Sequence, residues 1–113
     1  MDDLKARAYA ALLVLSGEVE KALEILSEYY GVTKPKLVVG LPKRAPKNIA
    51  GCYDPRKETI YVKSREELNN PFVILHEFYH HLRFFMGKHR GTEKHANKFA
   101  REAIEYLAKM KNT

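Results

Sequence analysis

The sequence has a single cysteine, no tryptophan, no glutamine and no long apolar run. Because Cys52 has no partner in the chain, an intrachain disulfide is excluded, and a reducing, cytoplasmic location is expected. The longest uncharged and largely apolar stretch, Ala8 to Leu15, is far too short to cross a bilayer, so no membrane span is expected. Asp2, Asp3 and a helical pattern stand where a cleavable signal would have basic and apolar segments.

The residues that are present are typical of a globular protein. Of the 113 residues, 45% are hydrophobic and 30% are charged, which predicts one folded domain over residues 1–113 and argues against a disordered chain. Lys, Arg and Glu are abundant, a composition typical of thermophilic proteins. The net charge of +6 comes from dispersed lysines and not from one basic block, so a nucleic-acid partner is not expected.

The first half of the chain combines a helical pattern with three strand-like runs. Apolar residues recur in steps of three and four over residues 4–30, which predicts one helix that Gly17 kinks or divides and Gly31 ends. The predicted apolar face consists of Leu12, Leu15, Val19, Ala22, Leu23, Leu26 and Tyr30. "KLVVGL" (36–41) is predicted as a buried strand. Residues 48–53 and 58–63 flank the turn sequence "DPRK" and predict an antiparallel hairpin.

The second half predicts two helices. In "NNPFVILHEFYHHLRFFMG" (69–87), Asn70 is a suitable N-cap, Pro71 suits the first helical position, and Gly87 ends the helix. After the loop "KHRGT", a final helix is expected from about Glu93 to Lys111. The order α-β-β-β-α-α predicts an α+β fold with a small antiparallel or mixed sheet.

The motif "HEFYHH" (76–81) contains three of the five histidines and one carboxylate. On a helix with about 100° per residue, His80 lies roughly 40° from His76, whereas His81 lies roughly 140° away. His76 and His80 can therefore bind one ion together, and His81 cannot join them. Glu77 lies beside this pair, which completes the H-E-x-x-H pattern of two zinc-binding imidazoles and a glutamate that handles the proton of a water.

A third ligand decides between a metal site and a helix that is merely rich in histidine, because catalytic zinc sites use three protein groups plus water. Glu93 shares a helix face with Ala96, Asn97 and Ala100, and the two small alanines would allow this helix to approach the first closely. Asn97, one turn further on, could hydrogen-bond the free ring nitrogen of a ligating histidine. The sequence therefore predicts a zinc site, one per chain, on His76 and His80, with Glu93 as the favoured candidate for the third ligand.

The two other downstream histidines have different predicted roles. His95 lies roughly 200° around the helix from Glu93, so it is interpreted as a histidine at the core boundary. His89 lies in the loop, where it remains a reserve ligand or a transition-state stabiliser.

"HEFYHHL" followed by the "ExxAN" spacing of Glu93 to Asn97 resembles the gluzincin metallopeptidases, and the size and basic character of the chain resemble the archaeal minigluzincins. The resemblance implies a minimal zincin-like catalytic domain with a long backing helix (residues 4–30), a small sheet of about three strands, an active-site helix and a glutamate helix. It also implies His76, His80 and Glu93 as zinc ligands and Glu77 as general base and acid.

The same resemblance implies how substrate would be held. The strand before the hairpin turn would form an exposed rim that pairs with extended peptide; its residues would be Asn48, Ile49, Ala50, Gly51, Cys52 and Tyr53. Members can be latent zymogens in which a terminal segment occupies the cleft. The chain lacks the lower subdomain that supplies an oxyanion-stabilising His or Tyr in larger gluzincins, and His89, Tyr106 and Tyr53 are the candidates to replace it.

The predicted function is a zinc-dependent endopeptidase in which a zinc-bound water attacks the peptide bonds of peptide or unfolded-protein substrates. Three alternatives stay open: a zinc-binding zincin-like module without peptidase activity, a protease acting on DNA-bound or regulatory proteins, and a metal-free nucleic-acid binder. The last would use Lys94, Lys98 and Arg101, although such a stripe is usually a solvated face. The sequence leaves the oligomeric state open.

Overall fold

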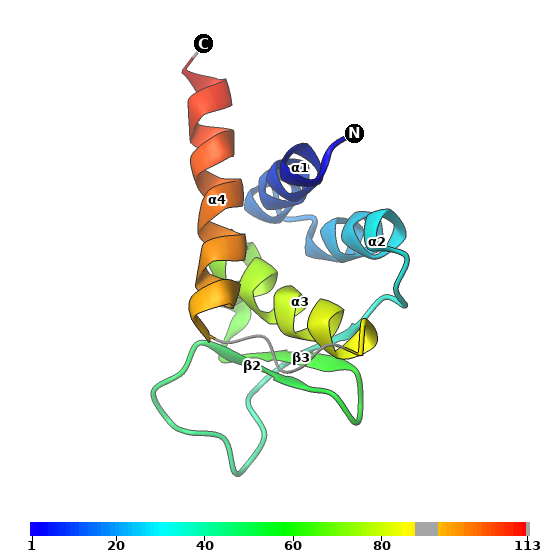
Figure 1. The fold of residues 1–113 in the computed structure, drawn as a ribbon. Coiled ribbons are helices and arrows are strands. Elements are labelled where there is room, and N and C mark those ends of the chain that lie inside the picture. Colours follow the sequence, from blue (N-terminus) through cyan, green and yellow to red (C-terminus); the bar gives the residue numbers. More distant parts are fainter. Residues whose placement is uncertain (88–92, 113) are drawn as a thin grey trace.

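The structure, a computed structural model, describes residues 1–87 and 93–112 (Figure 1). Within these ranges the elements in chain order are α1 (Asp3–Leu15), α2 (Val19–Tyr30), β1 (Lys36–Val39), β2 (Gly51–Asp54), β3 (Thr59–Val62), a short 3₁₀ helix (Arg65–Asn69), α3 (Pro71–Phe85) and α4 (Glu93–Lys111). The strands form one mixed sheet. The predicted α+β class is therefore confirmed, with an additional helix at the beginning of the chain.

Residues 4–30 divide at Gly17, as the sequence allowed, so the one long backing helix that the resemblance implies is not formed. Gly17 has a φ of 82°, a left-handed conformation that residues with a Cβ rarely adopt. The N–H of Gly17 donates to the carbonyl of Val14 at 3.1 Å, and the N–H of Glu18 donates to that of Leu13 at 2.8 Å. These two bonds form a helix-ending Schellman arrangement. The chain therefore turns, and α2 lies at an angle to α1 (Figure 1).

The predicted apolar face is confirmed in α2, where Val19, Ala22, Leu23 and Leu26 are buried, and is wrong in α1, because the helical period does not continue across the break. Leu12 and Leu15 are 37% and 50% exposed, although both were expected to be buried. The buried apolar residues of α1 are mostly small: Ala6, Ala8, Ala10, Ala11, Leu13 and Val14. These small residues allow the helices around α1 to pack closely against it.

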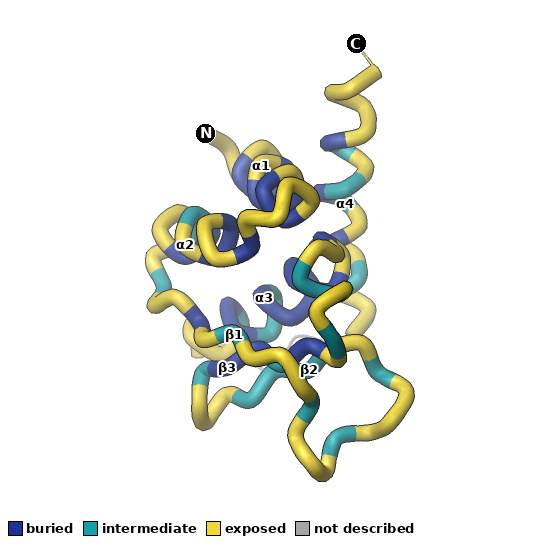
Figure 2. The backbone as a smooth tube through the Cα atoms, turned by 180° about the vertical axis from the view of Figure 1, so that it is seen from behind, coloured by how far each residue is buried: buried dark blue, intermediate teal, exposed yellow. Residues whose placement is uncertain are grey.

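The sheet has the order β1-β3-β2. The central strand β3 is buried through Ile60 and Val62. β2 pairs with it antiparallel, which confirms the predicted hairpin, and β1 pairs with it in parallel. β1 was expected to be buried, but it is an exposed edge strand in which Val38 and Val39 are 42% and 46% exposed (Figure 2).

β2 is the other edge of the sheet, as expected for a rim. It begins at Gly51, so Asn48, Ile49 and Ala50 precede the strand and do not belong to it. The pairing nevertheless continues slightly beyond the strand, because the carbonyl of Ala50 accepts a hydrogen bond of 2.8 Å from the N–H of Lys63.

α3 is the central helix of the fold and packs against the sheet, α1, α2 and α4 (Figures 1 and 2). The side chain of Asn70 accepts from the N–H groups of Phe72 and Val73, and Pro71 occupies the first turn. Gly87 follows the helix with a φ of 65°. The predicted start and end of this helix are therefore confirmed.

α4 is held against α1 and α3 by small residues and by one buried arginine. Ala96, Ala100 and Ala103 are fully buried, as the prediction of a close approach required. The Arg7 side chain of α1 is 7% exposed, donates to the carbonyl of Phe99 at 2.8 Å, and has its guanidinium 4.6 Å from the Phe99 ring centroid. These contacts fix the position of α4, whose first residue is Glu93.

In the described ranges, none of the helices combines the length and the apolar character needed to cross a membrane.

Gly51 lets β2 lie directly against α3. A Cβ atom at this position would be 2.9 Å from the backbone oxygen of Tyr61, 3.1 Å from Cγ1 of Val73 and 3.4 Å from Cγ of Glu77. The first two distances are shorter than ordinary contacts. Because one of the crowded atoms belongs to the backbone of the neighbouring strand, a side chain could be accommodated only if β2 moved.

We expect Gly51→Ala to lower the free energy of unfolding by about 1–3 kcal/mol, the usual cost of forcing an extra methyl group into a packed site. Urea unfolding measures this change. Cys52→Ala, the neighbouring position on the same strand, is the matched control, because it adds no atoms and should cost at most about 1 kcal/mol. Equal stability of Gly51→Ala and the wild-type protein would show that β2 and α3 are not in close contact.

Candidate metal centre

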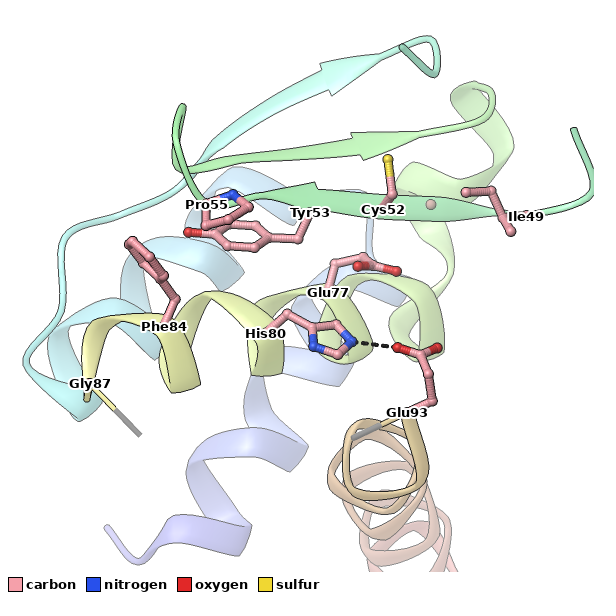
Figure 3. Close-up of a pocket in the computed structure, with 10 residues that line it drawn as sticks. Ile49, Cys52, Tyr53, Pro55, Glu77, His80, Phe84, Gly87 and Glu93 are labelled. Carbon is pink, nitrogen blue, oxygen red and sulfur yellow. Dashed lines mark hydrogen bonds and ion pairs between the residues drawn. The ribbon is translucent and has the colours of Figure 1, made fainter. Parts of the chain in front are cut away.

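Three side chains from two helices converge on one point. His76 and His80 lie one turn apart on α3, and Glu93 is the first residue of α4. Nε2 of His80 lies 2.8 Å from Oε1 of Glu93, and Nε2 of His76 lies 3.1 Å from Oε2 (Figure 3 shows the His80 contact). Each carboxylate oxygen therefore faces one imidazole, as the predicted ligand set requires.

This group can hold a metal ion. One ligand atom from each of the three residues lies within 4.8 Å of the others, so a single cation could contact all three. Two imidazole nitrogens and a carboxylate are the donors of catalytic zinc sites, which keep a fourth position open for water or substrate. His76 is 9% exposed, whereas the Glu93 side chain is 75% exposed. The site is therefore rigid on the α3 side and open on the α4 side.

Burial affects the protonation of His80. It lowers the pKa of the His80 imidazole, and the adjacent Glu93 carboxylate only partly opposes this effect. A low pKa favours the neutral imidazole, which is the form that binds a metal.

Glu77 lies beside the three ligands in a nearly closed environment. The residue is 6% exposed, and its Oε2 lies 3.9 Å from Nε2 of His76. Burial, with a smaller contribution from the negative charge of Glu93, raises the pKa of Glu77 to about 8. A carboxyl group whose pKa lies near neutrality can both accept and release a proton, which is what a general acid and base must do.

His81 points away from the three ligands, as its helical angle predicted, but its partners were not predicted. It is fully buried, with Nε2 2.6 Å from the carbonyl oxygen of Thr33 and Nδ1 2.6 Å from the hydroxyl of Tyr53. A carbonyl can only accept, so Nε2 carries the hydrogen. Burial lowers the pKa of His81 and keeps the ring neutral, so Nδ1 accepts the hydroxyl hydrogen of Tyr53.

The hydroxyl hydrogen of Tyr53 is therefore not available to stabilise an oxyanion, the role for which Tyr53 was a candidate. The one signal that could have revealed this link is the position of His81 on the buried face of α3. A fully buried imidazole needs hydrogen-bond partners, and two of them come from parts of the chain far away in sequence.

Of the other predicted site residues, those that the structure describes do not join the ligand group. Tyr106 lies thirteen residues beyond Glu93 on α4, about 20 Å along the helix axis, where it packs against the hydrophobic core. The structure therefore does not bring it to the three ligands, as the predicted role of a transition-state stabiliser would require. Asn97 is half-buried, and Nδ1 of His76 has no hydrogen-bond partner in the described part of the chain, so the expected bond between them is not formed. His95 is exposed, and His89 lies outside the described residues.

A cavity of about 720 Å³ opens between β2 and α3. It is lined by Ile49, Gly51, Cys52, Tyr53, Pro55, Glu77, His80, Phe84, Gly87 and Glu93 (Figure 3). Of the six predicted rim residues, Asn48 and Ala50 are not part of this lining. The terminal residues that the structure describes lie at the far end of the molecule from the sheet (Figure 1), so they do not fill the cleft as a latent arrangement would require.

The fold and the site together define an α+β protein with a His-His-Glu group that can hold a metal ion. Comparisons with family models, with curated proteins and with solved structures found no match to this chain. The argument for a function therefore rests on the site itself.

The raised pKa of Glu77 predicts how stability depends on pH in the metal-free protein. The pKa is about 8 in the folded state and about 4.3 in an unfolded chain. Between these values the folded state binds more protons than the unfolded state, so the free energy of unfolding falls as the pH rises. We expect the stabilisation from protonated Glu77 to be fully present below about pH 4 and to be lost by about pH 8. The free energy of unfolding should fall by on the order of a few kcal/mol over this range.

Urea unfolding of metal-free wild type and Glu77→Gln, at several pH values between about 5 and about 8, isolates this contribution. All other ionisable groups are present in both proteins, so their effect is largely removed when the two free energies of unfolding are subtracted. The wild type should lose stability relative to the variant as the pH rises. If the difference in free energy of unfolding between the two proteins did not change with pH, this would contradict the burial of an ionisable Glu77.

Proposed function

We propose that this protein is a zinc-dependent peptidase of the gluzincin type, in which His76, His80 and Glu93 hold the zinc and Glu77 moves the protons. The observation that carries the proposal is the convergence of Glu93 onto both imidazoles, with the buried Glu77 carboxyl beside them. Bound there, zinc would act as a Lewis acid that polarises a water and the substrate carbonyl.

The donor set favours zinc over the hard divalent cations. Mg²⁺ and Ca²⁺ prefer sites built almost entirely from oxygen atoms, whereas two of the three donors here are imidazole nitrogens. One such group is present in the described residues, which agrees with one zinc per chain.

Glu77 is the residue that would perform the proton transfers. A cation held by its neighbours favours the ionised carboxylate, because opposite charges lower the pKa of an acid. The carboxylate would then remove a proton from the attacking water and pass it to the leaving amine. Gly51 supports this role by letting β2 close over Glu77, and this contact restricts where the carboxyl can move.

The edge of β2 that faces away from β3 pairs with no other described strand, and it is the proposed substrate rim. Its pairing with β3 uses one side of the strand, so the backbone groups of the other side can pair with an extended peptide. Such pairing is made by main-chain hydrogen bonds and therefore has little sequence preference, which suits peptide and unfolded-protein substrates.

Two features favour an enzyme over a structural zinc module. Structural zinc sites are usually closed by four protein ligands, whereas the described site has three. Glu77 is 6% exposed, and in the described part of the chain no lysine or arginine forms an ion pair with it, so its burial is costly to the fold. No contact of Glu77 in the described residues offsets this cost in stability. A role in proton transfer explains why a carboxyl group is buried at this position.

We expect Glu77→Gln to keep its zinc and to lose peptidase activity by about 10²–10⁴-fold, the usual contribution of a general acid or base. Cleavage of a pool of unstructured peptides, followed by mass spectrometry, and zinc content are measured on the same preparations. Glu105→Gln, an exposed position on α4, is the matched control and should behave like the wild type. Full activity of Glu77→Gln would remove Glu77 from the mechanism.

A further inference from the structure

The cavity between β2 and α3 has two chemically different ends. One end contains the charged and ligating groups Glu77, His80 and Glu93. The other end is formed by Tyr53, Pro55 and Phe84, which Figure 3 shows gathered together away from Glu93. The ionisable side chains and the apolar wall therefore line the same cavity.

Phe84 continues the line of metal ligands along α3. It lies four residues after His80, just as His80 lies four residues after His76, so all three project from the same helix face. One further turn places Phe84 about 6 Å beyond His80 along the axis. The Phe84 side chain is 51% exposed, so it retains apolar surface that a ligand could cover.

Tyr53 forms the facing wall and is held in place. Its hydroxyl hydrogen is donated to His81 over 2.6 Å, and His81 is fixed in turn by the Thr33 carbonyl. The Tyr53 and His81 rings meet edge to face with centroids 5.3 Å apart. Because the hydroxyl is occupied within the protein, Tyr53 presents mainly ring surface to the cavity. The apolar end therefore exists before any ligand binds.

The direction of β2 decides which part of a peptide reaches this end. β2 runs from Gly51 to Asp54, and Pro55 follows it. Antiparallel pairing is the commoner arrangement of neighbouring strands, and a peptide paired in this way would run from the Pro55 end towards Gly51. Its residues on the N-terminal side of the cleaved bond would then lie between Tyr53 and Phe84.

We infer that Tyr53, Pro55 and Phe84 form a subsite for a large apolar side chain, aromatic or long aliphatic, immediately N-terminal to the cleaved bond. The inference rests on the proposed function and adds a substrate class to it: peptides that carry such a residue before the bond.

Binding of short hydroxamates to the zinc-loaded protein tests the subsite without any need for turnover. The probes are acetyl-Ala-Ala-hydroxamate and acetyl-Ala-Phe-hydroxamate, in which the hydroxamate takes the open metal position and the preceding side chain extends towards the subsite. We expect the Phe probe to bind the wild type at least about tenfold more tightly than the Ala probe, because a buried aromatic side chain contributes about this much. In Phe84→Ala the ratio should fall below about threefold.

Met86→Ala is the matched control. Met86 is 53% exposed near the same end of α3 and does not line the cavity, so this variant should keep the wild-type ratio. Zinc content and circular dichroism confirm that each variant is folded and loaded. Equal binding of the two probes by the wild type, or an unchanged ratio in Phe84→Ala, would overturn the inference.

A separate cleavage assay distinguishes the two proposals. If the Phe probe is preferred and the preference depends on Phe84, the subsite is supported even when no peptide is hydrolysed, and only the peptidase proposal fails. If peptides are cleaved by a Glu77-dependent activity without preference for a large apolar residue before the bond, the peptidase proposal stands and the subsite is overturned.

Discussion

The contact between Glu93 and the two imidazoles of α3 is the interaction on which the proposed chemistry of the site depends. It joins the first residue of α4 to the middle of α3 through distances of 2.8 and 3.1 Å. The surrounding fold brings these residues together: buried alanines let α4 approach α3, and Arg7 ties α4 to α1. The ligands hold one another in place, so a cation would meet a site that is already formed, with little ordering left to be done on binding.

The chemistry of the site follows from how unevenly its carboxyl groups are exposed. Glu93 is largely exposed and Glu77 is almost completely buried, so the two groups differ strongly in solvation although both lie next to His76. Solvation keeps a carboxylate charged, whereas burial favours its neutral form. The exposed glutamate is thus suited to bind a cation and the buried one to exchange a proton. Two residues of one type acquire different roles through their position in the fold.

Local signals in the sequence were sufficient for α3, α4 and the shared helix face of His76 and His80, because caps, proline, glycine and the i, i+4 spacing act within a few residues. They were insufficient where distant parts of the chain decide the outcome. The exposure of β1 follows from its edge position in the sheet, and the burial of small alanines in α1 follows from how closely its neighbours pack. The His81–Tyr53 bond joins residues 28 positions apart, and no local pattern encodes it. Tyr106 is separated from Glu93 by about 20 Å along α4, a distance that follows from the length of the helix.

Elemental mass spectrometry of the purified wild type, Glu93→Gln and Glu105→Gln, each refilled with zinc and then dialysed, tests the central claim most directly. The account predicts about one zinc per chain in the wild type, the same content in Glu105→Gln, and a clear loss in Glu93→Gln, because Glu93 is the residue that contacts both imidazoles in the described part of the chain. A wild type without zinc, or a Glu93→Gln variant that keeps all of it, would contradict a metal centre built from His76, His80 and Glu93.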